Sequence, residues 1–265
     1  MATTSGTPRP ASGTALITGA TAGIGLTFAR QLAAQGYDLV LVARDKGRLD
    51  EVAGELSAQH GVRTEVLAAD LSDRAQLATV EDRVASAEQP IDLLVNNAGF
   101  GLKHRFLDNS ADLEEQMLSV LVTAVLRLSH AALGAMTARG SGGIINVSSV
   151  AAFLPRGTYS AAKAWVNSFS EWAATEYGPR GVHVMALCPG FTKTEFHERM
   201  GLDAEHGSAP AWMWLDVEDL VSTALKDFGR KKIYSVPSAQ YKAIVGVTRA
   251  IPRGVLQRFQ SLGRK

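Results

Sequence analysis

The chain has 265 residues, of which 46% are hydrophobic and 20% charged, a composition that suits one large globular α/β domain. Its formal net charge at pH 7 is only +1, which argues against a nucleic-acid-binding function driven by overall charge. The single cysteine, Cys188, excludes an internal disulfide and suits a reducing compartment, so we expect a cytoplasmic protein.

Residues 1–12 are rich in Thr, Ser, Gly and Pro and contain no long apolar run. We therefore expect a disordered N-terminus that is neither a signal peptide nor an anchor. By the same reasoning we expect no membrane-spanning helix, since no segment approaches the roughly 20 apolar residues that one requires.

From residue 13 onward, short apolar runs alternate with longer segments of helical period, the pattern of repeated βα units. Strands are predicted at Thr14–Thr18, Asp38–Ala43, Arg63–Ala68, Ile91–Asn96, Gly143–Ser148, His183–Cys188 and Ile233–Val236. Helices are predicted at Ile24–Gln35, Lys46–Gln59, Ala75–Ala87, Ala111–Ala138, Tyr159–Tyr177 and Asp216–Phe228. The pattern predicts a doubly wound parallel sheet of about seven strands, a Rossmann fold with helices on both faces, in a single domain over residues 13–265.

The first predicted strand runs into a glycine-rich turn, Thr18–Gly25, and a helix follows at once. Glycines there allow a tight reversal, close approach of the backbone to a pyrophosphate, and close packing of the helix on the strand. The amides and dipole at the helix N-terminus favour phosphates. A simple tight βα loop is the alternative, but the turn opens the first βαβ unit, which favours dinucleotide binding.

The end of the second predicted strand bears on the choice between NAD and NADP. NAD sites commonly place an acid there to accept hydrogen bonds from the ribose hydroxyls. This chain has Arg44, whose guanidinium is well shaped for a 2′-phosphate, followed by Asp45, which either caps the next helix or weakens that preference. We predict NADP(H) over NAD(H); a merely solvated arginine is the alternative.

Several motifs in order resemble the short-chain dehydrogenase/reductase family over roughly residues 14–195. The glycine turn resembles TGxxxGxG, Asn96–Gly99 resembles NNAG, and Tyr159 with Lys163 resembles YxxxK. The resemblance also implies that Asp70 contacts the adenine amine and that the Pro189–Thr194 segment meets the nicotinamide. The residues expected to bind the cofactor are Gly19, Thr21, Ala22, Gly23, Ile24, Gly25, Arg44, Asp70, Leu71, Asn97, Ala98, Gly99, Tyr159, Lys163, Pro189, Gly190, Thr192 and Thr194.

Ser149, Tyr159 and Lys163 are the predicted catalytic residues. Tyr159 and Lys163 lie four residues apart on a predicted helix and so share one face. We expect the ammonium to lower the pKa of the phenol toward the working range, and Ser149 to donate a hydrogen bond to the developing alkoxide. The resemblance implies that Lys163 also holds the nicotinamide ribose. Taken alone, Tyr159 and Lys163 would be interpreted as an ordinary pair on a helix surface. Because the other motifs accompany them, we interpret the pair as catalytic.

Departures from the family pattern leave a second function open. Leu121 occupies the position of the family's active-site asparagine, and the spacing between Ser149 and Tyr159 is shorter than usual. The main prediction is an NADPH-dependent oxidoreductase that transfers a hydride between nicotinamide and the carbonyl or alcohol of an apolar, fairly bulky substrate. The alternative is a catalytically weak or inactive NADP(H)-binding or sensing protein.

The substrate is expected to contact a loop region over about residues 191–215. Ser149 and Tyr159, with the aromatic residues Phe153, Trp212 and Trp214, are the predicted pocket residues, although core packing is an equal alternative for the tryptophans. Their apolar character favours an acyl-chain or steroid-like ketone. The C-terminal part of the chain also loosely resembles the branch of the family that acts on such ketones. The six histidines show no metal-binding spacing, so no metal site is predicted.

The last part of the chain, about residues 237–265, is a basic extension. From Arg230 onward there are nine Lys or Arg and no Asp or Glu. Apolar positions alternate with these charges over Tyr241–Leu262, and Pro252 is expected to divide the segment into two short helices. Contact with an anionic membrane is the alternative interpretation of this pattern, and packing on the protein is favoured. The family resemblance also implies a homodimer through the predicted Ala111–Ala138 and Tyr159–Tyr177 helices.

Overall fold

The computed structural model describes residues 13–194 and 210–250 and contains the predicted parallel sheet. Its seven strands are β1 (Thr14–Thr18), β2 (Asp38–Ala43), β3 (Thr64–Ala68), β4 (Leu93–Asn96), β5 (Gly142–Val147), β6 (Val182–Leu187) and β7 (Tyr234–Ser235). Their order is β3-β2-β1-β4-β5-β6-β7, and every pair is parallel. The predicted doubly wound sheet is therefore confirmed, with small shifts at the strand ends.

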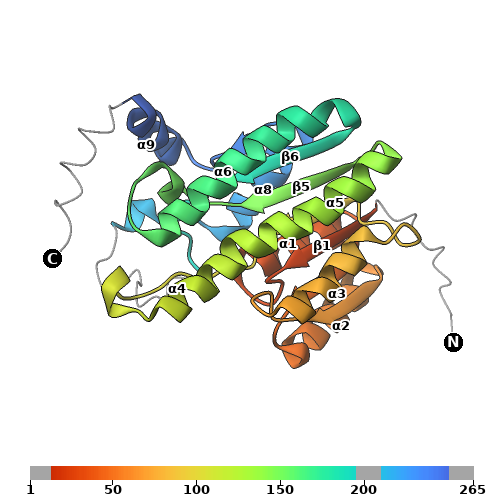
Figure 1. The fold of residues 1–265 in the computed structure, drawn as a ribbon. Coiled ribbons are helices and arrows are strands. Elements are labelled where there is room, and N and C mark those ends of the chain that lie inside the picture. The colour runs from red at the N-terminus through yellow and green to blue at the C-terminus, as the bar shows by residue number, and fades with distance from the viewer. Residues whose placement is uncertain (1–12, 195–209, 251–265) are drawn as a thin grey trace, which may run out of the picture.

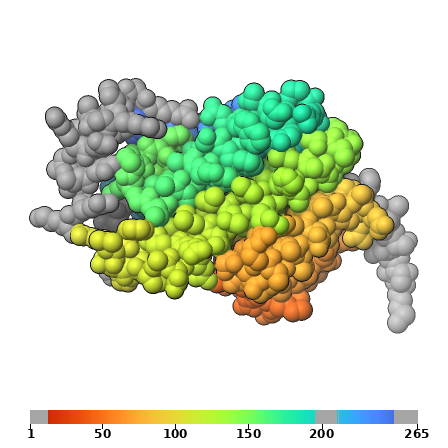
Figure 2. Space-filling view, viewed as in Figure 1, coloured from red at the N-terminus to blue at the C-terminus, as the bar shows by residue number. Residues whose placement is uncertain are grey.

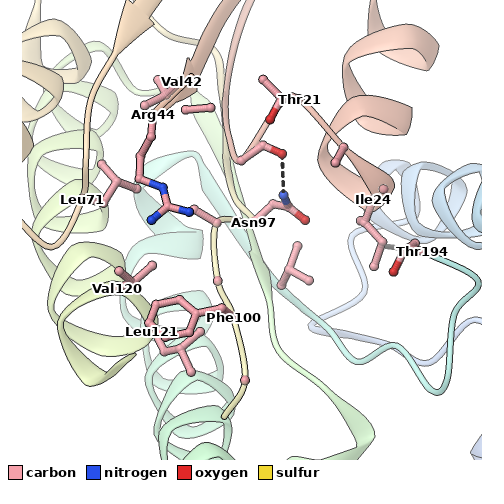
Figure 3. A pocket seen from close by; sticks show the side chains of 18 of the residues that line it. Thr21, Ile24, Val42, Arg44, Leu71, Asn97, Phe100, Val120, Leu121 and Thr194 are labelled. Carbon is pink, nitrogen blue, oxygen red and sulfur yellow. Dashed lines mark hydrogen bonds between the residues drawn. The ribbon is translucent and has the colours of Figure 1, made fainter. Parts of the chain in front are cut away.

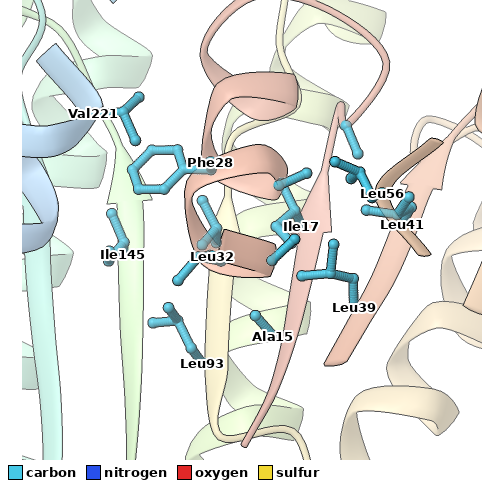
Figure 4. Close-up of a cluster of buried hydrophobic side chains, with 14 of the residues drawn as sticks. Ala15, Ile17, Phe28, Leu32, Leu39, Leu41, Leu56, Leu93, Ile145 and Val221 are labelled. Carbon is cyan, nitrogen blue, oxygen red and sulfur yellow. The ribbon is translucent and has the colours of Figure 1, made fainter. Parts of the chain in front are cut away.

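Helices cover both faces of the sheet, as Figure 1 shows. They are α1 (Gly23–Ala34), α2 (Lys46–His60), α3 (Arg74–Ala85), α4 (Ala111–Leu118), α5 (Val125–Arg139), α6 (Thr158–Tyr177), α8 (Val217–Gly229) and α9 (Ala239–Ala250). One apolar cluster joins α1, α2 and α8 to the first face, and another joins α3, α5 and α6 to the second. In Figure 4, Phe28 and Leu32 of α1 pack toward Ile17 of β1 and Ile145 of β5.

The run from Ala111 to Arg139 is continuous and includes a π-helical stretch, Ser119–Ala124, between α4 and α5. By length and composition it is apolar enough to cross a membrane, which the sequence reading did not anticipate. Half of its most apolar window is buried in the fold, and α5 packs on α3. A buried core helix has the same composition, so the run is weak evidence for a membrane span.

The position of the site follows from the strand order. The chain leaves β1 toward β2 on one side, whereas β4 pairs with β1 on the other. The loops that follow β1 and β4 therefore diverge at the carboxyl edge of the sheet and open a crevice between them. Parallel α/β sheets bind their ligands at such a switch point.

Candidate active site

A cavity of about 650 Å³ lies at this switch point. Figure 3 shows Arg44, Leu71, Val120 and Leu121 on one side of it and Ile24 with Thr194 on the other. Its described lining contains the predicted residues Gly19, Thr21, Ala22, Gly23, Ile24, Arg44, Asp70, Leu71, Asn97, Ala98, Gly99, Ser149, Tyr159, Lys163, Pro189, Gly190, Thr192 and Thr194. Residues far apart in the sequence, from the first to the last part of the family pattern, thus face one space.

The glycine-rich turn forms a backbone cradle at one side of the cavity. Gly19 and Gly23 have φ angles of 67° and 50°, the left-handed region that glycine adopts without strain. Gly25 packs instead of lining the cavity: a Cβ there would lie 2.2 Å from the carbonyl oxygen of Gly19. No side chain among the described residues caps α1 at Ala22, so the first amides of the helix are available to a ligand. This cradle fits the pyrophosphate of a dinucleotide.

Two polar residues join the ends of β1 and β4 beneath the cavity. The hydroxyl oxygen of Thr18 accepts hydrogen bonds from the backbone amides of Asn97 and Ala98, both at 2.9 Å. The side-chain amide of Asn97 donates to the carbonyl oxygens of Thr18 and Gly19, at 2.9 and 3.3 Å. These bonds hold the glycine turn against the neighbouring strand and so fix the cradle.

Charged residues line the opposite end of the cavity. Burial alone would raise the pKa of Asp70, but hydrogen bonds from the amide and hydroxyl of Ser72, with the nearby Arg44, hold it below its usual value. Asp45 caps α2 by accepting a hydrogen bond from the amide of Arg48. Arg48 also lines the cavity, which the sequence reading missed. Its place in the first turn of α2, four residues after Arg44, was the available signal.

The three predicted catalytic residues meet at the carboxyl end of β5. Ser149 and Tyr159 both line the cavity, and the Ser149 hydroxyl acts as a hydrogen-bonding neighbour of the Tyr159 phenol. The Lys163 ammonium donates to the carbonyl oxygen of Val147 at 2.7 Å, and its nitrogen lies 5.8 Å from the centre of the Tyr159 ring. Lys163 is only 5% exposed, so its position is fixed by packing as well as by this bond.

The expected effect of Lys163 on the phenol is corrected by the structure. Burial raises the pKa of Tyr159 to about 12, and the hydrogen bond with Ser149 offsets this only in part. Burial also lowers the pKa of Lys163 to about 8, and neighbouring Cys188 opposes that change. Among protein groups alone, desolvation therefore outweighs the attraction between ammonium and phenolate on which the sequence argument relied.

Leu121 lies in the π-helical stretch and forms an apolar wall of the cavity. It is 1% exposed and belongs to a buried cluster with Met117 and Ala162, against which Tyr159 and Phe100 pack. Where the family pattern has an asparagine, this chain therefore has a leucine that belongs to a hydrophobic cluster beside Tyr159. π-helical turns often mark such sites, because they shift side chains out of the regular helical register.

Of the predicted pocket residues, Ser149 and Tyr159 line the cavity, whereas three aromatic residues do not line it within the described part of the chain. Phe153, Trp212 and Trp214 are not among the described lining residues. Trp214 is buried with its ring centre 5.5 Å from that of Phe191, while Trp212 is 61% exposed. Leu215, next to Trp214, forms an isolated parallel β-bridge with Thr192, which follows Phe191.

Other sequence predictions concern residues that lie outside the described part of the chain. The disordered N-terminus, the middle of the predicted substrate loop and the second half of the basic extension lie outside the described residues. Within residues 13–194 and 210–250, no cluster of three or more His, Cys, Asp or Glu is arranged to hold a metal ion.

Comparison with known proteins gives a family for this fold and site. The model described as short chain dehydrogenase matches residues 13–205. The very-long-chain 3-oxoacyl-CoA reductase of Anas platyrhynchos is 34% identical over 190 residues, which cover 68% of this chain and 60% of the relative. The match thus spans about three fifths of that relative's length.

Two solved structures are similar over most of the chain. A short-chain dehydrogenase from Sphingobium yanoikuyae, in complex with NADPH, is 38% identical, with 89% of this chain and 94% of that chain covered and a TM-score of 0.82. The bulky-bulky ketone specific alcohol dehydrogenase from Comamonas testosteroni is 34% identical, with coverages of 93% and 96% and a TM-score of 0.77. This chain belongs to the short-chain dehydrogenase/reductase family, whose members are oxidoreductases acting on CH–OH and C=O groups.

Proposed function

We propose that the protein is an NADPH-dependent carbonyl reductase that acts on apolar, fairly bulky ketones. One observation carries the proposal: the hydroxyls of Ser149 and Tyr159 share a cavity with Lys163 and the glycine cradle. Nucleotide binding alone does not require these three side chains together, which disfavours the alternative of a non-catalytic NADP(H) sensor.

Reduced nicotinamide supplies a hydride to the carbonyl carbon when it is bound. The residues of this chain then supply the proton and orient the oxygen that receives it. A phenol with a pKa of about 12 keeps its proton at neutral pH, so Tyr159 is a proton donor in its resting form. Ser149 holds the substrate oxygen as negative charge develops on it. Because oxidation requires the phenolate, this resting state favours reduction.

The preference for NADPH is proposed from the charges at the adenosine end. Arg44 and Arg48 both line the cavity beside Asp70. Asp45, the first acid after β2, accepts a hydrogen bond from the backbone amide of Arg48 at the start of α2. A 2′-phosphate placed between two guanidinium groups forms charge-assisted hydrogen bonds that the hydroxyl of NAD does not match.

The substrate class is proposed from the walls near Tyr159. Phe100 and Leu121, which belong to the apolar cluster that includes Tyr159, line the cavity and leave an apolar surface for the part of the substrate beyond its carbonyl. The names of two relatives point the same way, since one reduces 3-oxoacyl-CoA and another is specific for bulky-bulky ketones.

A homodimer is proposed from the exposed faces of α5 and α6, which lie side by side in Figure 2. Leu126 of α5 and Trp172 of α6 are 45% and 52% exposed. Ring contacts link Trp172 to Phe169 and to Tyr177 along the same helix. Large apolar side chains gathered on one face mark association surfaces. Light scattering of Trp172→Glu tests this; a dimer that persists in the variant argues against the surface.

A coupled experiment tests the enzymatic proposal. The wild type should oxidise NADPH in the presence of ketones, with kcat/KM rising as the groups beside the carbonyl become larger and more apolar. Tyr159→Phe should abolish this turnover while NADPH still binds with nearly wild-type affinity, because the ring is retained and only the acid is lost. Binding without turnover in the wild type, across the whole ketone series, would favour the sensor.

A further inference from the structure

The C-terminal helix α9 lies beyond the residues matched by the family model, yet it borders the site. It packs against the short 3-10 helix Val150–Phe153, which follows Ser149 directly. In Figure 1 it occupies the same end of the molecule as that segment, above the carboxyl edge of the sheet. The helix therefore contacts a part of the chain that begins at a catalytic residue.

Tyr241, near the start of α9, is 2% exposed and links two other segments through its hydroxyl group. The oxygen accepts a hydrogen bond from the backbone amide of Phe191 at 3.0 Å. The same hydroxyl donates to the carbonyl oxygen of Met213 at 2.8 Å. The neighbouring Gln240 donates from its side chain to the carbonyl oxygen of Trp212 at 3.0 Å. Gln240 and Tyr241 of α9 thus donate hydrogen bonds to the successive carbonyl oxygens of Trp212 and Met213.

The ring of Tyr241 lies directly against the backbone of Gly190. A Cβ added to Gly190 would come within 2.0 Å of the ring atom Cε2 and 2.1 Å of Cζ. Gly190 lines the cavity. A glycine at this position is therefore required by contact with Tyr241, because the backbone has no room for a side chain between the cavity and the ring.

The segment that Tyr241 contacts, Gly190–Thr194, is the part of the predicted cofactor site that is expected to meet the nicotinamide. After Gly190, the carbonyl oxygen of Phe191 accepts from the amide of Leu215 at 2.8 Å, and the amide of Lys193 donates to the carbonyl oxygen of Leu215 at 3.1 Å. Thr192, between them, lines the cavity. Tyr241 joins both paired segments at one point, so displacing its hydroxyl loosens the wall that Thr192 belongs to.

We propose that Tyr241 is a positioning residue for the nicotinamide end of the cofactor, and that α9 is a structural part of the active site. Tyr241 touches neither the cavity nor the reacting atoms; it acts through Gly190 and Phe191. The inference rests on the proposed function, since it requires that the cavity bind NADPH.

Tyr241→Phe tests the hydroxyl group while keeping the ring. We expect the Kd for NADPH, followed by quenching of tryptophan fluorescence, to rise roughly tenfold, because the hydroxyl loses its hydrogen bonds with Phe191 of the cavity wall and with Met213 of the segment paired to it. We expect kcat at saturating NADPH to fall less than the affinity does. Tyr37→Phe is the matched control: Tyr37 precedes β2 at the amino edge of the sheet, and its removal should leave both quantities unchanged.

A double-mutant cycle separates positioning from general stability. Gly190→Ala should weaken NADPH binding more than tenfold in the wild-type background, because the new methyl meets the Tyr241 ring. In a Tyr241→Leu background the same change should cost severalfold less, since the smaller side chain leaves room for it. Circular dichroism verifies that each variant is folded.

The outcomes distinguish this inference from the proposed function. Wild-type protein that binds no NADPH overturns the proposed function, and the inference with it. Wild-type protein that binds and turns over, with Tyr241→Phe unchanged or with Gly190→Ala equally harmful in both backgrounds, overturns the positioning role alone.

Discussion

Leu121 fills the space directly in front of Gly99: a Cβ on Gly99 would lie 2.7 Å from the Cδ2 atom of Leu121. Gly99 ends the segment that the family pattern predicts to line the cofactor, and Leu121 stands where that pattern has an asparagine. The two residues fit each other as a pair, which indicates that the leucine is integrated into this site and does not simply replace a lost group. That relationship leads to the first prediction.

Leu121→Asn should destabilise the protein without increasing kcat. The amide would be buried among Met117, Ala162 and the ring of Tyr159, and we expect the free energy of unfolding to fall by about 2–4 kcal/mol. Urea unfolding and ketone-dependent NADPH oxidation measure the two effects. Leu121→Met, similar in volume, is the control and should cost less than about 1.5 kcal/mol. A rise in kcat at unchanged stability would mean that the leucine limits catalysis.

Lys163→Met should inactivate the enzyme and yet stabilise the fold. Burial lowers the pKa of Lys163 from 10.5 to about 8, which corresponds to roughly 3 kcal/mol of destabilisation at pH 7. The lost hydrogen bond to Val147 offsets part of the gain, so we expect the variant to be more stable by about 1–2 kcal/mol.

The same substitution has a pH signature. Between about pH 8 and 10.5 the unfolded chain binds the lysine proton more tightly than the folded protein, so this group makes stability rise with pH in that window. Below about pH 8 both states carry the proton and the penalty is constant. The stability advantage of Lys163→Met over wild type should therefore fall by about 2 kcal/mol from pH 8 to pH 10, which removes or reverses it. Denaturant unfolding across this range measures it; a constant difference would contradict the lowered pKa.

Arg44→Ser should weaken NADPH binding by roughly 10- to 100-fold, because charge-assisted hydrogen bonds to the 2′-phosphate are lost. NADH affinity should change little, since the hydroxyl form offers no such contact. Titration of both cofactors measures the ratio. Arg30→Ser, on the outer face of α1 where Arg30 pairs with Glu55, is the matched control. Equal losses for NADPH and NADH would show that Arg44 supports the site in another way.

Much of the fold and the cofactor site followed from local sequence patterns. Each of the main motifs lies within a short stretch of sequence and can be recognised from its residue types alone. They are the Thr18–Gly25 turn, Asn97 and the Tyr159–Lys163 pair. Parallel strands gather their carboxyl ends at one edge, so residues that follow different strands were expected to meet there. The cavity contains nearly all of them.

What failed depended on packing between distant segments. Trp214 lies against Phe191, in a segment that pairs with Leu215 through Thr192, and no local pattern encodes that pairing. The pKa of Tyr159 is governed by burial, whereas helix spacing indicated only its charged neighbour. Tyr241 was assigned to an amphipathic tail, because its contact with Gly190 joins residues far apart in the chain.

Glu114 gives a final prediction about how the catalytic helix is held. Its carboxylate is buried, accepts a hydrogen bond from the hydroxyl of Thr158, and accepts another from the side chain of Asn109. Thr158 is the first residue of α6 and immediately precedes Tyr159, while Gly157 provides no side-chain cap to that helix. The carboxylate therefore ties the start of α6 to α4, at an end of the helix where negative charge is favourable.

Glu114→Ala should lower the free energy of unfolding by about 1–3 kcal/mol and reduce kcat severalfold, because the first turn of α6 and its tyrosine lose their anchor. Glu114→Gln retains an acceptor for Thr158 and should recover part of both. Thr158→Val tests the partner: combined with Glu114→Ala it should add little, since both changes remove one contact. Additive losses in kcat would show that the carboxylate acts on the site independently of Thr158, and the anchoring role would then be wrong.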